Sequence, residues 1–338
     1  MSLLEMFHHI EQGGEWPQAL LVGLITAIEK QPHAHHPTAF RPICVLSMAY
    51  QTWASIRTKQ ILTWLSQFAP AGLIGNRSRK ETAHIWWTIS AMVERSWYDE
   101  EPISGCISDI VKCYSCSPLI PVFAMAKKIG IPNQILRPWA TVITGLERRF
   151  VITGGAGPGL KSTTGFPEGD PLSVASMFLV NLALFEGVKI SAPRVQLWSF
   201  VDNLETTGPT PEEVLDSLEI TREFCTEFDI QLDESETICW ATNASSREYT
   251  RLSGCRVVFD TRDLGGQLLF CRRHTSKVVR ARVTGLADFW PRLARSPAPL
   301  RQKETCLRVA AWPKALHGIS TTIFGADHIS CAPKHFAV

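Results

Sequence analysis

Trp198-Ser199-Phe200-Val201-Asp202-Asn203-Leu204 is the stretch of this sequence that says most about the fold. The extended apolar run 195–198 leads into it, and the more polar run 205–209 follows. Apolar flanks around a polar centre predict a β-hairpin whose tip lies near Val201 and Asp202. Such a tip holds a carboxylate at a fixed point. Taken alone, an aspartate there is more often a turn residue that bonds its own backbone, so its meaning depends on the rest of the chain.

Length and composition place the chain among ordinary folded proteins. A chain of 338 residues predicts one large domain with subdomains, or two domains. Its 45% hydrophobic and 20% charged residues are typical of a packed fold. No long uninterrupted apolar run suits a membrane helix, and residues 1–5 lack the basic start of a signal peptide. We therefore expect an intracellular protein, nuclear or cytoplasmic, not secreted, with no membrane partner and with reduced cysteines.

Charge is distributed unevenly along the chain. The net charge of +2 combines a basic end with an acidic remainder. Residues 270–338 contain twelve Lys or Arg and three Asp or Glu, a balance of +9. A basic end on an acidic body predicts contact with a polyanion such as nucleic acid, the alternative being a solvated basic surface.

Hydrophobic periodicity and capping residues predict a chain that alternates helices with short strands. The predicted helices are 47–65, 80–95, 117–129, 172–184, 211–228 and 275–295, the last with a kink or break at Pro291. The predicted strands, besides the hairpin, are 20–28, 40–46, 103–107, 148–152, 238–240, 256–259 and 268–270. Asp170 and Pro171 suit the start of the helix 172–184.

A second carboxylate accompanies Asp202. The predicted strand 103–107 leads into Ser108 and Asp109. An aromatic residue, Tyr114, follows five positions after Asp109. A glycine-containing turn, 165–171, lies between the two aspartates in the sequence. Two carboxylates from separate strands can hold a pair of Mg²⁺ ions that activate a 3′-hydroxyl and stabilise the departing pyrophosphate in nucleotidyl transfer. We expect the two carboxylates within about 8 Å, since such ions lie roughly 3.5–4 Å apart.

The order of these motifs resembles the reverse transcriptase domain of non-LTR (LINE-type) retrotransposons, over most of the chain. Each motif alone is weak, and the order and spacing together carry the resemblance. The matching stretches are Arg41-Pro42-Ile43 (fingers motif), Asp109 to Tyr114 (motif A), Gly165 to Ser173 (motif B), Phe200 to Asn203 (motif C), Gln231-Leu232-Asp233 (motif D) and Leu264-Gly265-Gly266 (primer-grip region).

The resemblance implies an α/β (α+β) right-hand polymerase fold with palm, fingers and a partial helical thumb. Residues 1–100 would be fingers, and residues 101–270 the palm, with a fingers insertion at about 130–165. Residues 271–338 would be a basic, thumb-like segment. The implied activity is RNA-directed DNA synthesis with Mg²⁺, or Mn²⁺ in its place. The implied partners are an RNA template, a DNA primer or RNA/DNA hybrid, and a dNTP.

The resemblance also assigns roles to residues of the catalytic motifs. Asp109 and Asp202 would be the metal ligands, with Asn203 beside them in the catalytic motif. Tyr114 would lie under the sugar and exclude the 2′-hydroxyl of a ribonucleotide by bulk. A core aromatic residue is the alternative for Tyr114.

Four further residues would bind the incoming nucleotide. Lys30 and Arg41 would reach the triphosphate, where cationic donors stabilise developing charge. A solvated loop is the alternative, more so for Lys30 than for Arg41. Gly169 would let the backbone lie close to the nucleotide or template, next to Glu168.

Three positions depart from the family pattern. Asn203 stands where a second Asp is expected, and an amide offers one neutral carbonyl oxygen instead of a charge. Glu168 stands where Gln is usual and adds a negative charge near the triphosphate. Glu236 stands where Lys is usual and removes a candidate proton donor. These departures leave open a weak or inactive polymerase, a non-catalytic RNA-binding remnant of a retroelement, or an RNA-templated polymerase that makes RNA.

Overall fold

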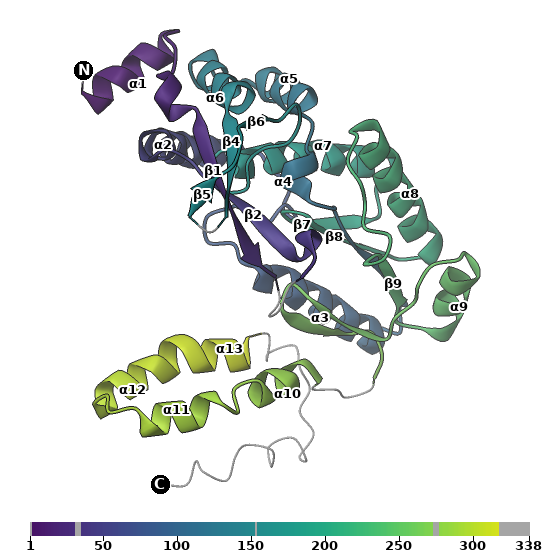
Figure 1. The fold of residues 1–338 in the computed structure, drawn as a ribbon. Coiled ribbons are helices and arrows are strands. Elements are labelled where there is room, and N and C mark those ends of the chain that lie inside the picture. Colours follow the sequence, from purple (N-terminus) through teal and green to yellow (C-terminus); the bar gives the residue numbers. More distant parts are fainter. Residues whose placement is uncertain (1, 31–34, 153, 273–276, 318–338) are drawn as a thin grey trace.

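The computed structural model describes residues 2–30, 35–152, 154–272 and 277–317. The described chain forms a mixed α/β body and a smaller C-terminal group of helices (Figure 1). Two sheets make up most of the body, and each has helices packed against it. The candidate site lies at one end of the antiparallel sheet described next.

The central sheet contains the predicted hairpin. Its strands are β7 (Gln196–Phe200), β8 (Asn203–Gly208), β3 (Ser104–Asp109) and β9 (Ile238–Ala241). They pair antiparallel in the order β7-β8-β3-β9. The helices α7 (Ser173–Ser191) and α8 (Pro211–Glu227) pack against one face. The opposite face packs against α3 (Thr82–Tyr98) and the hairpin of β10 (Asp260–Asp263) and β11 (Gly266–Leu269).

The second sheet lies beside the first (Figure 1). Its strands are β1 (Val22–Glu29), β2 (Phe40–Val45), β4 (Glu147–Ile152), β5 (Gly155–Ala156) and β6 (Leu160–Lys161). The order is β2-β1-β4-β5, with β6 also paired to β4. The helices that accompany this sheet are α1 (Leu3–Glu11), α2 (Met48–Leu65), α5 (Leu119–Ile129) and α6 (Asn133–Gly145). The two sheets share the large core that runs along α7.

Several predicted helix ends are confirmed by their capping geometry. The hydroxyl of Ser47 accepts from the N–H of Tyr50 and caps α2. Thr210 caps α8, which has proline at its first turn. Gly130 ends α5 with a left-handed φ of 106°.

The helix α7 is apolar and long enough to cross a membrane by length and composition, and most of it is buried inside the body.

Other sequence predictions were wrong. Residues 256–259 form no full strand, and Val257 makes only an isolated parallel bridge to Cys239 of β9. The helices α6 and α9 (Ala244–Leu252) were not predicted. The predicted helix 275–295 is divided into α10 (Lys277–Thr284) and α11 (Phe289–Arg295), and the break lies at 285–288. Pro291 instead falls in the first turn of α11, where a missing N–H is tolerated.

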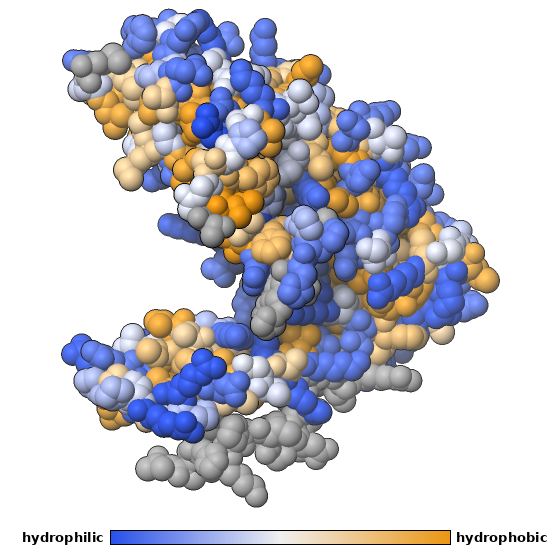
Figure 2. Space-filling model, viewed as in Figure 1, coloured by the Kyte–Doolittle hydropathy of each residue, from blue (hydrophilic) through white to orange (hydrophobic). Residues whose placement is uncertain are grey.

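The C-terminal helices form a separate small core. After α10 and α11 come α12 (Leu300–Cys306), a π-helical turn (Leu307–Ala311) and α13 (Trp312–Leu316). Leu286, Ala311 and Ala315 are buried among them. Figure 2 shows a wide hollow between these helices and the body. Residues 273–276 and 318–338 of the predicted basic segment lie outside the described residues.

Candidate active site

The two aspartates that the sequence singles out end up on adjacent strands. In the antiparallel pair of β3 and β8, Asp109 lies directly opposite Asn203. The N–H of Ile110 donates to the carbonyl of Asp202 over 3.0 Å. The pairing therefore brings Asp109 and Asp202 to the same end of the central sheet.

The hairpin tip that carries Asp202 has an unusual backbone. Phe200 pairs with Asn203, which leaves a loop of only Val201 and Asp202. Val201 has a φ of 65°, which is rare for a β-branched residue and costs about 1–3 kcal/mol. The surrounding structure must hold such a conformation in place.

Two elements hold the tip. The buried Asn181 of α7 donates from Nδ2 to the Val201 carbonyl over 2.7 Å and to Ser199 Oγ over 2.8 Å. On the other side, the N–H groups of Ile74 and Gly75 both donate to the Ser199 carbonyl. A Cβ at Gly75 would lie 2.7 Å from the Val201 nitrogen, so only glycine permits this approach. The position of Asp202 is therefore fixed by its supports.

The end of the sheet concentrates negative charge. Burial raises the pKa of Asp109 to about 7, and the charges of Asp202 and Asp233 add to the increase. Asp233 donates its N–H to the Asp109 carbonyl over 2.7 Å, which places the 231–233 segment beside β3. Burial also raises the pKa of Asp202, against the Cys113 thiol and the charge of Arg41, which lower it. A carboxyl group whose pKa is raised toward 7 by burial and by neighbouring carboxylates is typical of sites that bind a cation.

The residues after Asp109 line the same site. Cys113 lies in α4 (Cys113–Cys116), and its thiol donates to Asp202 Oδ2 over 3.8 Å. Tyr114 is half-buried and packs against the core. Burial raises its pKa, and the charge of Asp202 adds to this, so its ring lies near the carboxylates. Asn76 interacts with its hydroxyl. Tyr114 therefore packs partly as a core aromatic residue, and its place under the sugar of a nucleotide stays a prediction.

The glycine turn 165–171 packs against β2. Gly169 has a φ of 114°, and a Cβ there would lie 2.5 Å from the Cys44 carbonyl. The Glu168 carbonyl accepts from the N–H of Cys44 over 2.6 Å. The rest of Gly169 is exposed, and the Glu168 side chain accepts from the Ser115 hydroxyl over 3.2 Å. Their predicted contact with a nucleotide stays a prediction.

Asp170 does not cap the following helix in the expected way. The helix α7 begins at Ser173 and extends to Ser191, well beyond the predicted 184. Asp170 is buried, and its Oδ1 accepts from the N–H of Leu172 over 3.1 Å and from the Tyr50 hydroxyl over 3.0 Å. Burial raises its pKa to about 6. Asp170 therefore ties the turn to α2, and so supports the neighbouring Gly169.

The two predicted phosphate contacts differ in position. Arg41 is exposed on β2 and close enough to Asp202 for its charge to lower the pKa of that carboxyl. Lys30 follows the end of β1 and is exposed. Its side chain makes no hydrogen bond or ion pair with the other candidate residues in the described chain. Arg41 therefore lies within electrostatic range of Asp202, whereas Lys30 is exposed and is not bonded to the other candidate residues.

Asn203 belongs to a buried polar group that the sequence did not reveal. Its Nδ2 donates to Asp263 Oδ1 over 2.8 Å. Asp263 and Glu205 are 6% and 0% exposed. Burial and the nearby Asp263 raise the pKa of Glu205 well above its ordinary value. The one available signal was an acidic residue, Glu205, within a predicted strand of the hairpin, next to the apolar Leu204.

The donor set suits a magnesium-type ion. Within the described ranges, no three His, Cys, Asp or Glu side chains surround a single point closely enough to enclose a metal. Asp109 and Asp202 supply carboxylate oxygens, which Mg²⁺ prefers. Mg²⁺ is commonly bound through one or two carboxylates, with water and substrate phosphates completing its shell. The residues present therefore fit a metal that arrives with its substrate.

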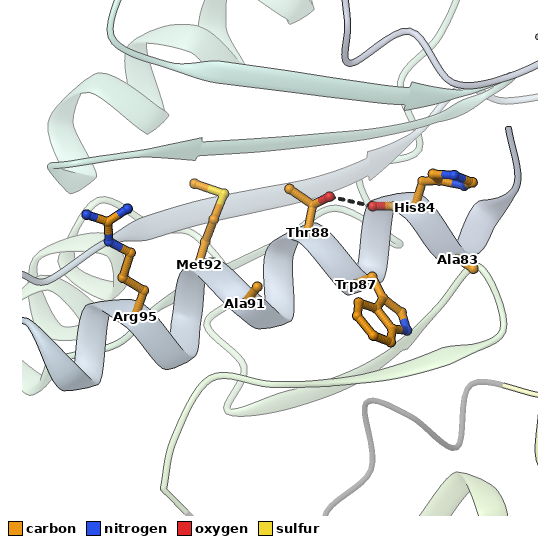
Figure 3. A pocket seen from close by; sticks show the side chains of 7 residues that line it. All are labelled: Ala83, His84, Trp87, Thr88, Ala91, Met92 and Arg95. Atoms are coloured by element: carbon orange, nitrogen blue, oxygen red, sulfur yellow. Dashed lines mark hydrogen bonds between the residues drawn. The ribbon is translucent and has the colours of Figure 1, made fainter.

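One cavity lies away from these residues. About 680 Å³ opens along the outer face of α3, lined by Ala83, His84, Trp87, Thr88, Ala91, Met92 and Arg95 (Figure 3). These side chains come from one helix, and the Thr88 hydroxyl donates to the His84 carbonyl over 2.6 Å. None of the candidate catalytic residues lines this cavity. The groove is therefore separate from the carboxylate site.

No family model and no curated protein matches the sequence. Solved structures do match the fold. Telomerase from Candida tropicalis, in complex with a TWJ fragment of telomeric RNA, aligns with a TM-score of 0.55 at 12% identity, over 89% of this chain and 54% of that chain. The chain shares the fold of telomerase.

Two further structures give the same result. A C-terminally truncated apo telomerase from Candida tropicalis aligns with a TM-score of 0.54 at 13% identity, over 78% of this chain and 57% of that one. Telomerase from Candida albicans, with a TWJ fragment of telomeric RNA, gives 0.52 at 11% identity, over 92% and 58%. The chain therefore spans little more than half the length of these telomerases. At this identity the likeness concerns the fold, which is of the polymerase type.

Proposed function

We propose that the chain is an RNA-directed DNA polymerase (reverse transcriptase) domain that uses two-metal nucleotidyl transfer. The observation that carries the proposal is the pairing of β3 and β8, which brings Asp109 and Asp202 together at a fixed hairpin tip. The polymerase-type fold supports it. The motif order favours an origin in a non-LTR (LINE-type) retroelement, with the body as fingers and palm and the basic helices as a partial thumb.

In this proposal Asp109 and Asp202 hold the metal ions, and neighbouring residues set the protonation and orientation of the two carboxyl groups. The ions would supply charge for the attacking 3′-hydroxyl and the leaving pyrophosphate. Asp109 must release its proton to become a ligand, and its pKa of about 7 allows this at neutral pH. The Cys113 thiol, which donates to Asp202, would orient that carboxylate, and Arg41, whose charge acts on Asp202, would meet the triphosphate.

The proposed partners are an RNA template, a DNA primer or RNA/DNA hybrid, and a dNTP. The hollow between the body and the basic helices offers room for a nucleic acid (Figure 2). Three described arginines, Arg292, Arg295 and Arg301, lie on α11 and α12 and would contact its phosphates. Two of the telomerases with a similar fold carry a telomeric RNA fragment, which supports RNA as a partner here.

A second candidate function is supported by a specific contact. The Asn203 amide donates to Asp263 instead of offering a second carboxylate beside Asp202. The site therefore has one negative charge fewer than the motif usually provides. A non-catalytic protein that keeps the fold and binds RNA is consistent with this arrangement.

Primer extension separates the two candidates. The protein would be assayed on poly(rA)/oligo(dT) with dTTP, first with Mg²⁺ and then with Mn²⁺. We expect extension that is stronger with Mn²⁺, which binds a given ligand set more tightly. Asp202→Asn should abolish it, and Asp216→Asn, an exposed change on α8, should not. Hybrid binding without any extension by the unchanged protein would favour the non-catalytic function.

A further inference from the structure

The amide of Asn203 lies above two buried acids. Its Nδ2 is 2.8 Å from Asp263 Oδ1, and Asp263 comes from β10, on the face of the central sheet that packs against α3. Glu205, two residues along β8, belongs to the same face and interacts with Asp263. Three polar side chains thus meet inside a cluster that is otherwise apolar.

Acceptor oxygens outnumber donors in this group. Asn203 Oδ1, Asp263 Oδ2 and both carboxylate oxygens of Glu205 are buried and meet no hydrogen-bond donor among the described residues. Among the described residues, the group's donated hydrogen bond runs from Asn203 to Asp263. Burial and the nearby Asp263 raise the pKa of Glu205 well above its ordinary value, which favours its neutral form. The Asn203 amide stabilises the Asp263 carboxyl by donating a hydrogen bond to it.

Residue 203 also faces the candidate active site. It lies opposite Asp109 in the ladder, and directly opposed residues point to the same face with Cβ atoms about 4.5–5.5 Å apart. The side chain at 203 is thus between the Asp109–Asp202 pair and the buried Asp263–Glu205 pair. A carboxylate at 203 would meet acids on both sides.

We propose that Asp263 is the positioning residue for Asn203, and that the acids buried beneath residue 203 require an amide there. This inference rests on the proposed function for its meaning, because only then is residue 203 part of a catalytic motif. In this pair the amide is at 203 and the carboxylate is at 263. Asn203 is then a matched partner of Asp263 and not a degraded ligand.

The inference reverses a simple expectation from the sequence. Restoring the usual residue, Asn203→Asp, removes the donor to Asp263 and opposes two carboxylates across 2.8 Å. The single change should therefore damage the sheet. Asp263→Asn should suppress the damage, because the hydrogen bond re-forms with donor and acceptor reversed and the net charge is that of the natural pair.

Hydrogen–deuterium exchange of the β8 backbone amides, without metal or nucleotide, tests the pairing. Asn203→Asp should increase their exchange rates at least tenfold, or about 1.4 kcal/mol. Asp263→Asn alone should stay within about threefold of the natural protein, because an amide oxygen still accepts. The double variant should return to within about threefold.

Asp260→Asn provides the matched control, since it makes the same change on the same strand at a residue that bonds Gln267. It should not suppress Asn203→Asp. If Asn203→Asp does not fold, recovery of folded protein by Asp263→Asn but not by Asp260→Asn gives the same answer. Equal exchange in Asn203→Asp and the double variant would overturn the inference, as would unchanged exchange in Asn203→Asp. Because no metal or substrate is present, these results are independent of polymerase activity.

Discussion

Replacing Asp109 with asparagine should stabilise the metal-free protein at alkaline pH and leave it little changed near pH 4. The folded-state pKa of Asp109 is about 7, raised from 3.8, chiefly by burial and then by Asp202 and Asp233. An acid whose pKa is raised contributes stability below its unfolded pKa, and this is lost as pH rises to the folded value. Asparagine does not titrate, so its advantage should grow from about pH 4 to pH 7 and then stay constant.

The size of this stabilisation follows from the difference between the folded and unfolded pKa of Asp109. About three pKa units correspond to roughly 4 kcal/mol as an upper bound. Asp109 is only half-buried, and solvent screening reduces this to about 1–2 kcal/mol. For a chain of this size the melting temperature at pH 8 should then rise by about 1.5–3 °C.

Thermal unfolding in EDTA at pH 4, 6 and 8 measures the difference between the variant and the natural protein. Asp216→Asn, on the exposed face of α8, is the control and should show no such trend. A difference that is the same at pH 4 and pH 8 would refute the reasoning, because Asp109 would then not titrate in the acidic surroundings described.

Three further predictions concern the supports of the site and the basic helices. Gly169→Ala should destabilise by more than about 1–3 kcal/mol in urea unfolding, because it combines a positive φ with a clash on Cys44, whereas Gly254→Ala has the same sign of φ in open space and should cost less. Asn181→Ala should cost about 1–3 kcal/mol, since the Val201 carbonyl loses its donor; an unchanged midpoint would contradict this. Changing Arg292, Arg295 and Arg301 to Gln should reduce the salt slope of single-strand binding by about 2, while Arg251→Gln on α9 should leave it unchanged.

Local sequence was enough to predict the elements that carry the site. The hairpin tip at Val201 and Asp202 follows from apolar flanks around a polar centre, and the cap of α2 from Ser47. The pairing of β3 with β8 is long-range, so no local pattern gives it. The order of the motifs was the source of that expectation, and the register places Asp109 opposite Asn203.

The failures have physical causes as well. No helix was predicted at 133–145, and Pro138 lies buried within α6, where packing outweighs the lost hydrogen bond. The divided basic helix breaks at Gly285, where no side chain favours the helix, and not at Pro291. Asp263 could not be connected to Asn203 from sequence, because their contact depends on how β10 packs beneath the sheet.

Binding of Mn²⁺ to the free protein, followed by electron paramagnetic resonance at pH 8, tests the central claim most directly, because it needs neither a template nor chemistry. If Asp109 and Asp202 form one site, the natural protein should bind Mn²⁺, and Asp109→Asn and Asp202→Asn should each weaken binding at least tenfold. Asp216→Asn should bind as the natural protein does. Equal binding by all four proteins would contradict a metal site formed by the two carboxylates.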